Sequence, residues 1–307
     1  MEKYTEKKQR NQVFQKFIKR HIGENQMDLV ENCNTFLSFV TDKTLEKKKL
    51  YKSNPCKNRF CPVCAWRKAR KDALSLSLMM QYIKQQENKE FIFLTLTTPN
   101  VNSDELENEI KGYNNSFRKL IKRKKVDSVI KGYVRKLEIT YNKKRDDYNP
   151  HFHVLIAVNK SYFTDKRYYI SQKEWLNLWR DVTGMPEITQ VRVQKIKQNN
   201  NKELYEMAKY SGKDSNYLIN QKVFDAFYKS LKGKQILVYS GLFKDARKKL
   251  KNGDLDYLKE VDPTEYIYQI FYVWNQKEYL ASEIFDLTEE EKSKINHRMI
   301  DEIEEEN

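Results

Sequence analysis

The chain reads Pro150-His151-Phe152-His153-Val154-Leu155-Ile156-Ala157-Val158 near its middle, where two of its four histidines head an apolar run. The run is typical of a β-strand, in which residues i and i+2 point to the same face of a sheet. His151 and His153 therefore share one face, while the other face is lined by Phe152, Val154, Ile156 and Val158. Two imidazoles that converge from a rigid strand make half of a metal site. The alternative is a pair of surface histidines on a half-exposed strand.

The segments around this strand alternate between strand and helix patterns. Residues 91–98 and 133–141 are rich in β-branched and aromatic side chains, and the short polar turn 142–149 suits an antiparallel pair with the histidine strand. The order β-α-β-β-α-β-α-β favours an α+β fold with an antiparallel or mixed sheet of about five strands, covered by helices. The remaining predicted elements are helices at 65–87, 106–120, 173–182 and 201–229, the last with a possible interruption near Gly212, and strands at 188–196 and 235–240.

Composition divides the chain into three expected segments. Residues 1–88 are a basic helical segment that holds all four cysteines, and residues 89–242 form the domain around the histidine strand. Residues 243–307 are an extension with a predicted hairpin at 266–280 and an acidic tail that begins with a capped helix. The hairpin could extend the central sheet or bind a partner, but packing into a core is the preferred interpretation.

Glu138 is the best candidate for a third metal ligand. It lies on the strand before the histidine strand, and Leu137 and Ile139 point away from it. If the two strands pair through the intervening turn, its carboxylate reaches the face of His151 and His153. A set of two histidines and one carboxylate leaves open coordination positions and accepts Mg²⁺ or Mn²⁺ as well as Zn²⁺.

A second constellation lies at residues 206–213. Glu206 and Tyr210 are four residues apart on one predicted helix face, with Lys209 and Lys213 close by. A tyrosine hydroxyl is a poor nucleophile at neutral pH, but nearby lysines favour the phenolate and attract a phosphate. A carboxylate one turn away can act as a base for an attacking water. Tyr217 is a rival nucleophile in the same register, and an ordinary solvated helix face is the simpler alternative.

The cysteines are spaced like metal ligands. Cys56, Cys61 and Cys64 fall within nine positions, and Cys33 can supply a fourth thiolate. In a chain without a secretion signal this clustering favours metal over disulfides. We predict a structural Zn²⁺ site, because four thiolates close the coordination shell. Reduced cysteines without a metal are the alternative.

The charge balance points to a polyanionic partner. The chain has 58 Lys and Arg against 43 Asp and Glu, a net charge of +15, although the last residues from 281 are acidic. No apolar run approaches the roughly 20 residues that cross a bilayer, and the N-terminus lacks the apolar core of a signal peptide. The sequence therefore predicts a cytoplasmic protein without a membrane partner.

Together these motifs resemble the rolling-circle replication initiators of small bacterial plasmids, within the HUH endonuclease superfamily. His151-Phe152-His153 matches the H-U-H motif, in which U is a bulky apolar residue. The segment 93–97 is similar to the first motif of the family. The segment 206–210 is similar to its tyrosine motif, in the branch that pairs one tyrosine with a glutamate. The cysteine segment 56–68 also resembles that branch, and the matches follow the family order.

The resemblance implies a ferredoxin-like or RRM-like HUH fold and a site-specific DNA nickase. A metal on His151, His153 and Glu138 would polarise the scissile phosphate of plasmid origin DNA. Tyr210 would attack, leaving a 5′-phosphotyrosine and a free 3′-OH primer, and Glu206 would direct water in the terminating cleavage. A host helicase is the expected protein partner.

Three other functions remain open. A relaxase for plasmid transfer or a single-strand transposase would use the same histidine motif. Relaxases typically place the tyrosine before the histidines, whereas Tyr210 follows them here, and such transposases are usually much shorter. A non-catalytic, zinc-dependent DNA-binding regulator would explain the charge and the cysteines. It would leave the histidines, Glu206 and Tyr210 without a purpose.

Overall fold

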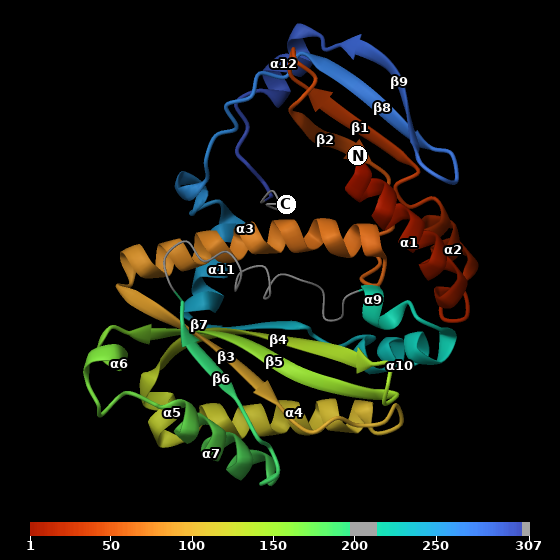
Figure 1. The fold of residues 1–307 in the computed structure, drawn as a ribbon. Helices are drawn as coiled ribbons and strands as arrows, with labels where there is room; N and C mark the ends of the chain where they lie inside the picture. The colour runs from red at the N-terminus through yellow and green to blue at the C-terminus, as the bar shows by residue number, and fades with distance from the viewer. Residues whose placement is uncertain (197–213, 303–307) are drawn as a thin grey trace. The chain divides into compact units, whose positions relative to one another are not determined.

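The computed structural model describes residues 1–196 and 214–302, which form two compact units. We call Asp72–Leu258 the central unit, and Met1–Lys71 together with Lys259–Asn307 the terminal unit. Each unit contains one antiparallel sheet, with strand order β6-β3-β5-β4-β7 in the central unit and β2-β1-β8-β9 in the terminal unit. The prediction of an α+β fold with a five-stranded antiparallel sheet is confirmed (Figure 1).

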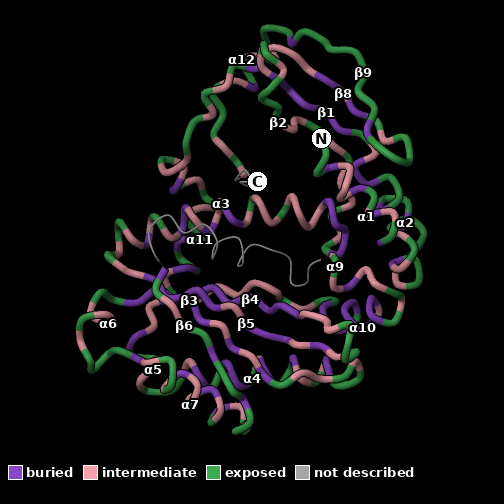
Figure 2. The backbone as a smooth tube through the Cα atoms, in the orientation of Figure 1, coloured by how far each residue is buried: buried purple, intermediate pink, exposed green. Residues whose placement is uncertain are grey.

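The histidine strand is β5, and it lies in the middle of the five-stranded sheet. β5 (Asp147–Asn159) pairs with β3 (Lys89–Thr97) on one side and with β4 (Ile130–Asn142) on the other. β6 (Arg192–Lys195) and β7 (Leu237–Gly241) form the edges. A central strand with two buried faces explains the continuous apolar run that follows the histidines. Figure 2 shows this part of the sheet as largely buried.

Helices cover one face of this sheet. α4 (Leu106–Ile121) buries its predicted apolar stripe there, and the rings of Tyr113 and Phe117 contact Phe152 edge-on. α7 (Gln172–Thr183) begins with a capping box at Ser171 and ends at Gly184 in the left-handed conformation. The other helices of the central unit are α5 (Lys124–Val129), α6 (Ser161–Thr164), α9 (Asp214–Tyr217), α10 (Gln221–Leu231), α11 (Leu242–Asn252) and the 3₁₀ helix η1 (Asp256–Leu258).

The opposite face of the sheet carries the histidines. α11 packs over one end of this face, where the ring of Phe243 lies against Phe91. α3 (Pro62–Gln86) begins in the terminal unit and continues into the central unit, where Lys249 of α11 lies over the ring of Tyr82. The other end of the face, around Thr97 and His151, is where the polar residues gather.

The terminal unit differs from the expected helical segment because it is built around a second sheet. β1 (Phe36–Thr41) and β2 (Lys48–Ser53) form a hairpin that the sequence analysis missed. The predicted C-terminal hairpin exists as β8 (Tyr268–Trp274) and β9 (Tyr279–Asp286), and β8 pairs with β1. The hairpin therefore completes this sheet and does not extend the central one. The helices of this unit are α1 (Glu2–Ile18), α2 (Glu24–Glu31) and α12 (Glu289–Ile295), the last capped by Thr288 as expected.

The two units do not coincide with the three expected segments. Residues 243–258, expected in the C-terminal extension, belong to the central unit as α11 and η1. The assignment of functions to the three segments stays a prediction.

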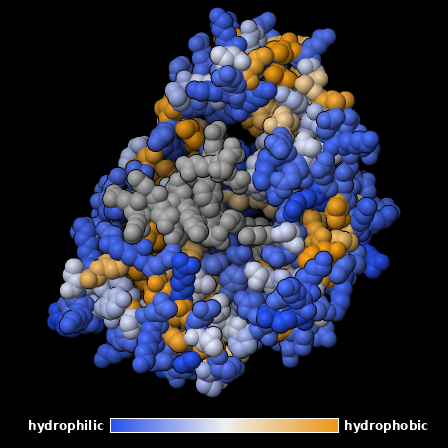
Figure 3. Space-filling view, in the orientation of Figure 1, coloured by the Kyte–Doolittle hydropathy of each residue, from blue (hydrophilic) through white to orange (hydrophobic). Residues whose placement is uncertain are grey.

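The visible face is mostly hydrophilic, with apolar side chains gathered near β9, where Leu280, Ile284 and Phe285 are about half exposed (Figure 3).

Two glycines allow the close approach of β4 and β7. Gly132 pairs with Gly241, and a Cβ atom on Gly132 would lie 2.6 Å from the backbone N of Leu242 and 2.7 Å from the backbone O of Ser240. We expect Gly132→Ala to lower the free energy of unfolding by about 1–3 kcal/mol, because backbone atoms cannot move aside easily. Gly112→Ala is the matched control, since nothing lies within 4 Å of a Cβ at that helical site and alanine favours helix. Chemical denaturation of both variants checks the difference, and equal stabilities would contradict it.

Candidate active site

The pairing of β4 and β5 brings together the polar residues of the central sheet. In the antiparallel register Glu138 lies opposite His151, and Lys136 lies opposite His153. On the other side of β5, Thr95 of β3 lies opposite His153. Directly opposite residues in an antiparallel pair project to the same face. All five side chains therefore stand on the face that is not covered by α4.

The Glu138 carboxylate is the hub of this group. Its Oε2 atom lies 3.3 Å from Nε2 of His153 and 3.9 Å from Nε2 of His151. The ammonium of Lys136 donates a hydrogen bond of 3.0 Å to the same oxygen. Lys136 is fully buried and the Glu138 side chain is 5% exposed, while the imidazoles are 11% and 12% exposed. The imidazoles thus form the accessible edge of a buried charge cluster.

Hydrogen bonds orient both imidazole rings. The Nδ1 atom of His151 lies 3.2 Å from the backbone O of Asn149, which can only accept, so Nδ1 carries the hydrogen and Nε2 keeps its lone pair. His153 Nδ1 lies 3.2 Å from the hydroxyl of Thr95, and its ring stacks on Phe93. Partners on the far ring nitrogen are the usual way in which proteins aim a metal-binding histidine.

Side chains from the helices α4 and α7 hold the backbone of β5 and β3 next to the histidines. The hydroxyl of Tyr113 in α4 donates a 2.7 Å hydrogen bond to the backbone O of Pro150, next to His151. The indole N–H of Trp179 in α7 donates a 2.8 Å hydrogen bond to the backbone O of Thr97. Both donors are buried in the core, so the backbone beneath the site is held by packed helices.

Burial and the neighbouring charges favour the protonation states of His151 and Glu138 that can bind a metal. Burial lowers the pKa of His151 to about 4, although the Glu138 carboxylate opposes the shift, so this imidazole is neutral at pH 7. Burial raises the pKa of Glu138, but Lys136 and the two histidines outweigh it and hold the pKa of Glu138 well below its usual range. A neutral imidazole beside a carboxylate anion is the state that metal coordination requires.

The three predicted ligands fit a divalent cation. One ligand atom from each of Glu138, His151 and His153 lies within 4.8 Å of the others. Metal–ligand bonds of about 2.1 Å at right angles place neighbouring ligand atoms about 3 Å apart, close to the separation of Glu138 from His153. Lys136 was missed by the sequence analysis. Its position two residues before Glu138, on the same face of β4, could have indicated that it belongs to the site.

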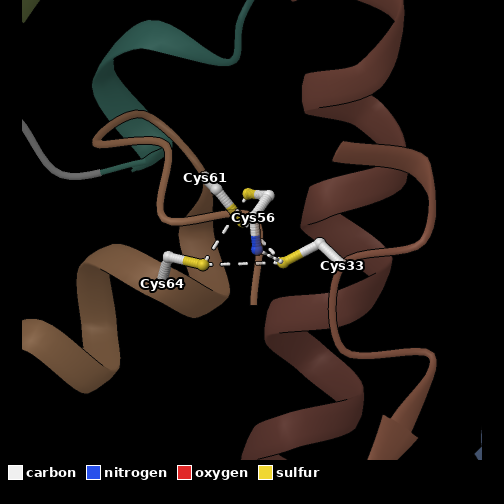
Figure 4. A group of neighbouring side chains, drawn as sticks. All are labelled: Cys33, Cys56, Cys61 and Cys64. Carbon is white, nitrogen blue, oxygen red and sulfur yellow. Dashed lines mark hydrogen bonds between the residues drawn. The ribbon is translucent and has the colours of Figure 1, made fainter. Parts of the chain in front are cut away.

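The four cysteines come together in the terminal unit (Figure 4). Sγ of Cys33 lies 3.6 Å from that of Cys61 and 3.5 Å from that of Cys64, and Sγ of Cys56 lies 3.7 Å from that of Cys64. Zn–S bonds of about 2.3 Å in a tetrahedron separate the sulfur atoms by about 3.8 Å, whereas a disulfide joins them at about 2.0 Å. The donor set and its spacing fit a tetrahedral Zn²⁺ site.

The tyrosine constellation lies largely beyond what the structure describes. Glu206, Lys209, Tyr210 and Lys213 fall outside the described residues. Tyr217 is described, and it is 1% exposed, with its ring among Phe224 and Phe227. The predicted helix 201–229 is broken after Tyr217, because Asn220 caps a new helix, α10, through the backbone N–H of Val223. This burial makes Tyr217 a core aromatic residue and a poor candidate nucleophile.

A polar cavity continues the same sheet face beyond His151. Thr140 lies opposite Asn149 in the β4–β5 register. This pair is two residues along each strand from the pair of Glu138 and His151, and so it lies on the same face. The cavity has a volume of about 470 Å³, and the residues that line it all have polar or charged side chains. It is lined by Asn100, Thr140, Tyr141, Asn142, Lys143, Lys144, Arg145 and Asn149. The sequence predicted the polar turn at 142–149 but did not indicate this cavity.

Known proteins with similar sequences are replication proteins. The sequence profile of the family described as "Replication protein" matches residues 47–280. A "Protein rep" of Staphylococcus aureus is 92% identical over 221 residues, which cover 72% of this chain and 96% of the relative. A "Protein rep" of Bacillus amyloliquefaciens is 35% identical over 251 residues, 74% of each chain. One of Streptococcus pneumoniae serotype 2 (strain D39 / NCTC 7466) is 35% identical over 250 residues, 77% of each chain.

No solved structure matches the chain. Within the described residues, no helix is both long enough and apolar enough to span a membrane. The profile covers three quarters of the chain, including all three predicted ligands on the central sheet and three of the four cysteines. The chain therefore belongs to the replication protein family, in agreement with its resemblance to plasmid rolling-circle replication initiators.

Proposed function

We propose that this replication protein nicks one strand of its plasmid origin by tyrosine transesterification and so starts rolling-circle replication. The observation that carries the proposal is the convergence of Glu138, His151 and His153 on one sheet face. Family membership and the net charge of +15 support a DNA substrate. A non-catalytic regulator would have no use for a buried carboxylate between two oriented imidazoles.

The chemistry needs a polarised phosphate and a positioned nucleophile. Mg²⁺ or Mn²⁺ on Glu138, His151 and His153 would supply Lewis-acid polarisation of the scissile phosphate. The hydroxyl oxygen of Tyr210 would bond to the phosphorus, and the bond from phosphorus to the 3′ oxygen would break. The phenolic proton goes to a base in the solvent, and the 3′ oxygen takes up a proton. The products are a 5′-phosphotyrosine and a free 3′-OH primer.

Residues near Tyr210 in the sequence would serve this step and its reversal. Lys209 and Lys213 would attract the phosphate and favour the phenolate. Glu206 would direct a water molecule in the terminating cleavage, so that a second tyrosine is not needed. Extension of the primer requires unwound template, which makes a host helicase the proposed partner in the cytoplasm.

The DNA strand would enter along the polar cavity. Its floor continues the sheet face of the site, and the exposed cations Lys143 and Lys144 stand at the tip of the β4–β5 hairpin. Amide side chains such as Asn100 and Asn149 can contact bases and sugars, while lysines contact phosphates.

The cysteine cluster is a separate site, and we propose that it holds a structural Zn²⁺ through Cys33, Cys56, Cys61 and Cys64.

Tyr210→Phe is expected to abolish the covalent protein–DNA adduct, because the variant lacks the attacking oxygen. Tyr217→Phe is the control and should retain adduct formation, since Tyr217 is buried among aromatic rings. The assay is incubation of supercoiled plasmid carrying the cognate origin with Mn²⁺ or Mg²⁺, followed by denaturing electrophoresis. An adduct formed by Tyr210→Phe would refute the choice of nucleophile, and a wild-type protein that nicks no cognate origin would refute the nickase.

His153→Ala is expected to reduce nicking and Mn²⁺ affinity by ~100-fold or more, because it removes one of three protein ligands. His297→Ala is the matched control, since His297 lies in the terminal unit and contributes to neither metal cluster. Titration calorimetry measures Mn²⁺ binding, and chelation by EDTA should stop nicking by the wild type. Unchanged Mn²⁺ affinity in His153→Ala would show that the metal is held elsewhere.

The double variant Lys143→Ala/Lys144→Ala is expected to bind single-stranded origin DNA more weakly. Loss of two phosphate contacts should reduce the slope of log affinity against log salt by about 1.4. Lys160→Ala/Lys166→Ala removes two exposed lysines beyond the opposite end of β5 and serves as the control. Fluorescence anisotropy at several salt concentrations gives both slopes. Equal slopes for the two double variants would exclude the cavity as the DNA path.

A further inference from the structure

Lys8 is a buried lysine beside the cysteine cluster. It lies on α1 and is 1% exposed. Its ammonium donates hydrogen bonds to the backbone O of Cys33 at 2.6 Å, to the backbone O of Glu31 at 3.2 Å and to Oδ1 of Asn11 at 3.2 Å. An ammonium has three N–H donors, and the three oxygen acceptors use all of them. The geometry therefore fits the charged form of the side chain.

Within residues 1–196 and 214–302, no carboxylate forms an ion pair with this ammonium. All partners of Lys8 within the described residues are neutral oxygens, and none belongs to an aspartate or glutamate side chain. An unpaired buried charge is strongly destabilising, so a nearby negative charge is required. The cysteine cluster lies beside Lys8, because Lys8 contacts the backbone of Cys33 and its partner Asn11 donates to Sγ of Cys61.

The remaining neighbours of the sulfurs are hydrogen-bond donors. The amide of Asn34 donates to Sγ of Cys33 at 3.0 Å, and the amide of Asn11 donates to Sγ of Cys61 at 3.3 Å. The backbone N–H of Cys56 donates to Sγ of Cys33 at 3.3 Å. Asn11 and Asn34 are fully buried. Donors aimed at sulfur stabilise thiolates, the form in which cysteine binds a metal.

A divalent ion on four thiolates has a net charge of −2, and Lys8 reduces the charge of this buried group to −1. We propose that Lys8 is the counter-charge of a metal tetrathiolate, so that metal binding by the cysteines docks helix α1 onto the terminal unit. This inference rests on the proposed Zn²⁺ site, but it does not depend on the proposed nicking activity. Lys8 is a positioning residue, because it acts on the metal through the cysteines.

The position of Lys8 on α1 explains how metal and helix are coupled. Tyr4, Lys8, Asn11, Phe14 and Ile18 form the buried stripe of α1, so the polar pair at its centre faces the cluster. Tyr4 contacts the rings of Phe39 and Trp66 beside that pair. Removal of the metal would take away the cross-link among the cysteines and the negative charge that faces Lys8. The apolar contacts alone would then have to retain a helix with a buried ammonium.

The first test compares Lys8→Met with Lys16→Met in the full-length chain. Methionine retains the length of the lysine stem without the charge, and Lys16 is an exposed lysine on the same helix. Competition with a chromogenic chelator gives the Zn²⁺ affinity of each variant. We expect Lys8→Met to bind Zn²⁺ about 10–100-fold more weakly than the wild type, and Lys16→Met to match the wild type. Equal or tighter binding by Lys8→Met would overturn the proposal.

The second test uses the wild-type chain and so does not depend on the folding of a variant. Hydrogen exchange of the α1 amides is measured with Zn²⁺ bound and after its removal by a chelator under reducing conditions. We expect exchange in α1 to become at least ~10-fold faster without Zn²⁺, while the strands of the central unit keep their protection. Unchanged protection of α1 would overturn the coupling. A nicking assay on the same samples separates this outcome from any failure of the proposed function.

Discussion

The register between β4 and β5 is the constraint on which the candidate active site depends. It sets Glu138 opposite His151 and Lys136 opposite His153. A slip of one residue would send every side chain of one strand to the other face, and Glu138 would exchange places with the buried Leu137 or Ile139. A tight turn fixes the register, with Asn142 paired to Asp147 and Asp146 in the left-handed conformation. The pattern of apolar residues on the α4 side secures the same register independently.

The two faces of the central sheet at β5 have different roles, one in packing and the other in the candidate site. The face toward α4 carries Phe152 and Val154, both fully buried, and supplies the hydrophobic stabilisation of the sheet. On the other face of the sheet, the two imidazoles of β5 lie beside the carboxylate and the ammonium of β4, all with little exposure, and burial of any one of them alone would be costly. They are tolerated because each has a partner in the cluster. This arrangement holds the ligand atoms in place before any metal or DNA arrives.

The sequence predicted those parts of the structure that depend on neighbours along the chain. The apolar run in residues 150–158 predicted the strand, and the short turn from residues 133–141 predicted its pairing and hence Glu138. Lys136 was overlooked because a lysine on a strand usually points to solvent, and its burial depends on the surrounding fold. β1 and β2 were missed because their sheet is completed by β8, more than 200 residues away. The break before Asn220, which buries Tyr217, depends on a helix cap that apolar spacing does not reveal.

The two buried lysines of the described residues lie one at each metal-ligand cluster, and the charges around them differ. At the central sheet, Lys136 pairs with the single carboxylate of Glu138, and this ion pair leaves almost no net negative charge. A divalent ion there would gain little electrostatic attraction and would keep open positions, which fits the proposed contact with a phosphate. At the cysteines, four thiolates would exceed the charge of one Lys8 by three. The proposed Zn²⁺ would therefore be bound more tightly and have no open position, which fits a structural cross-link.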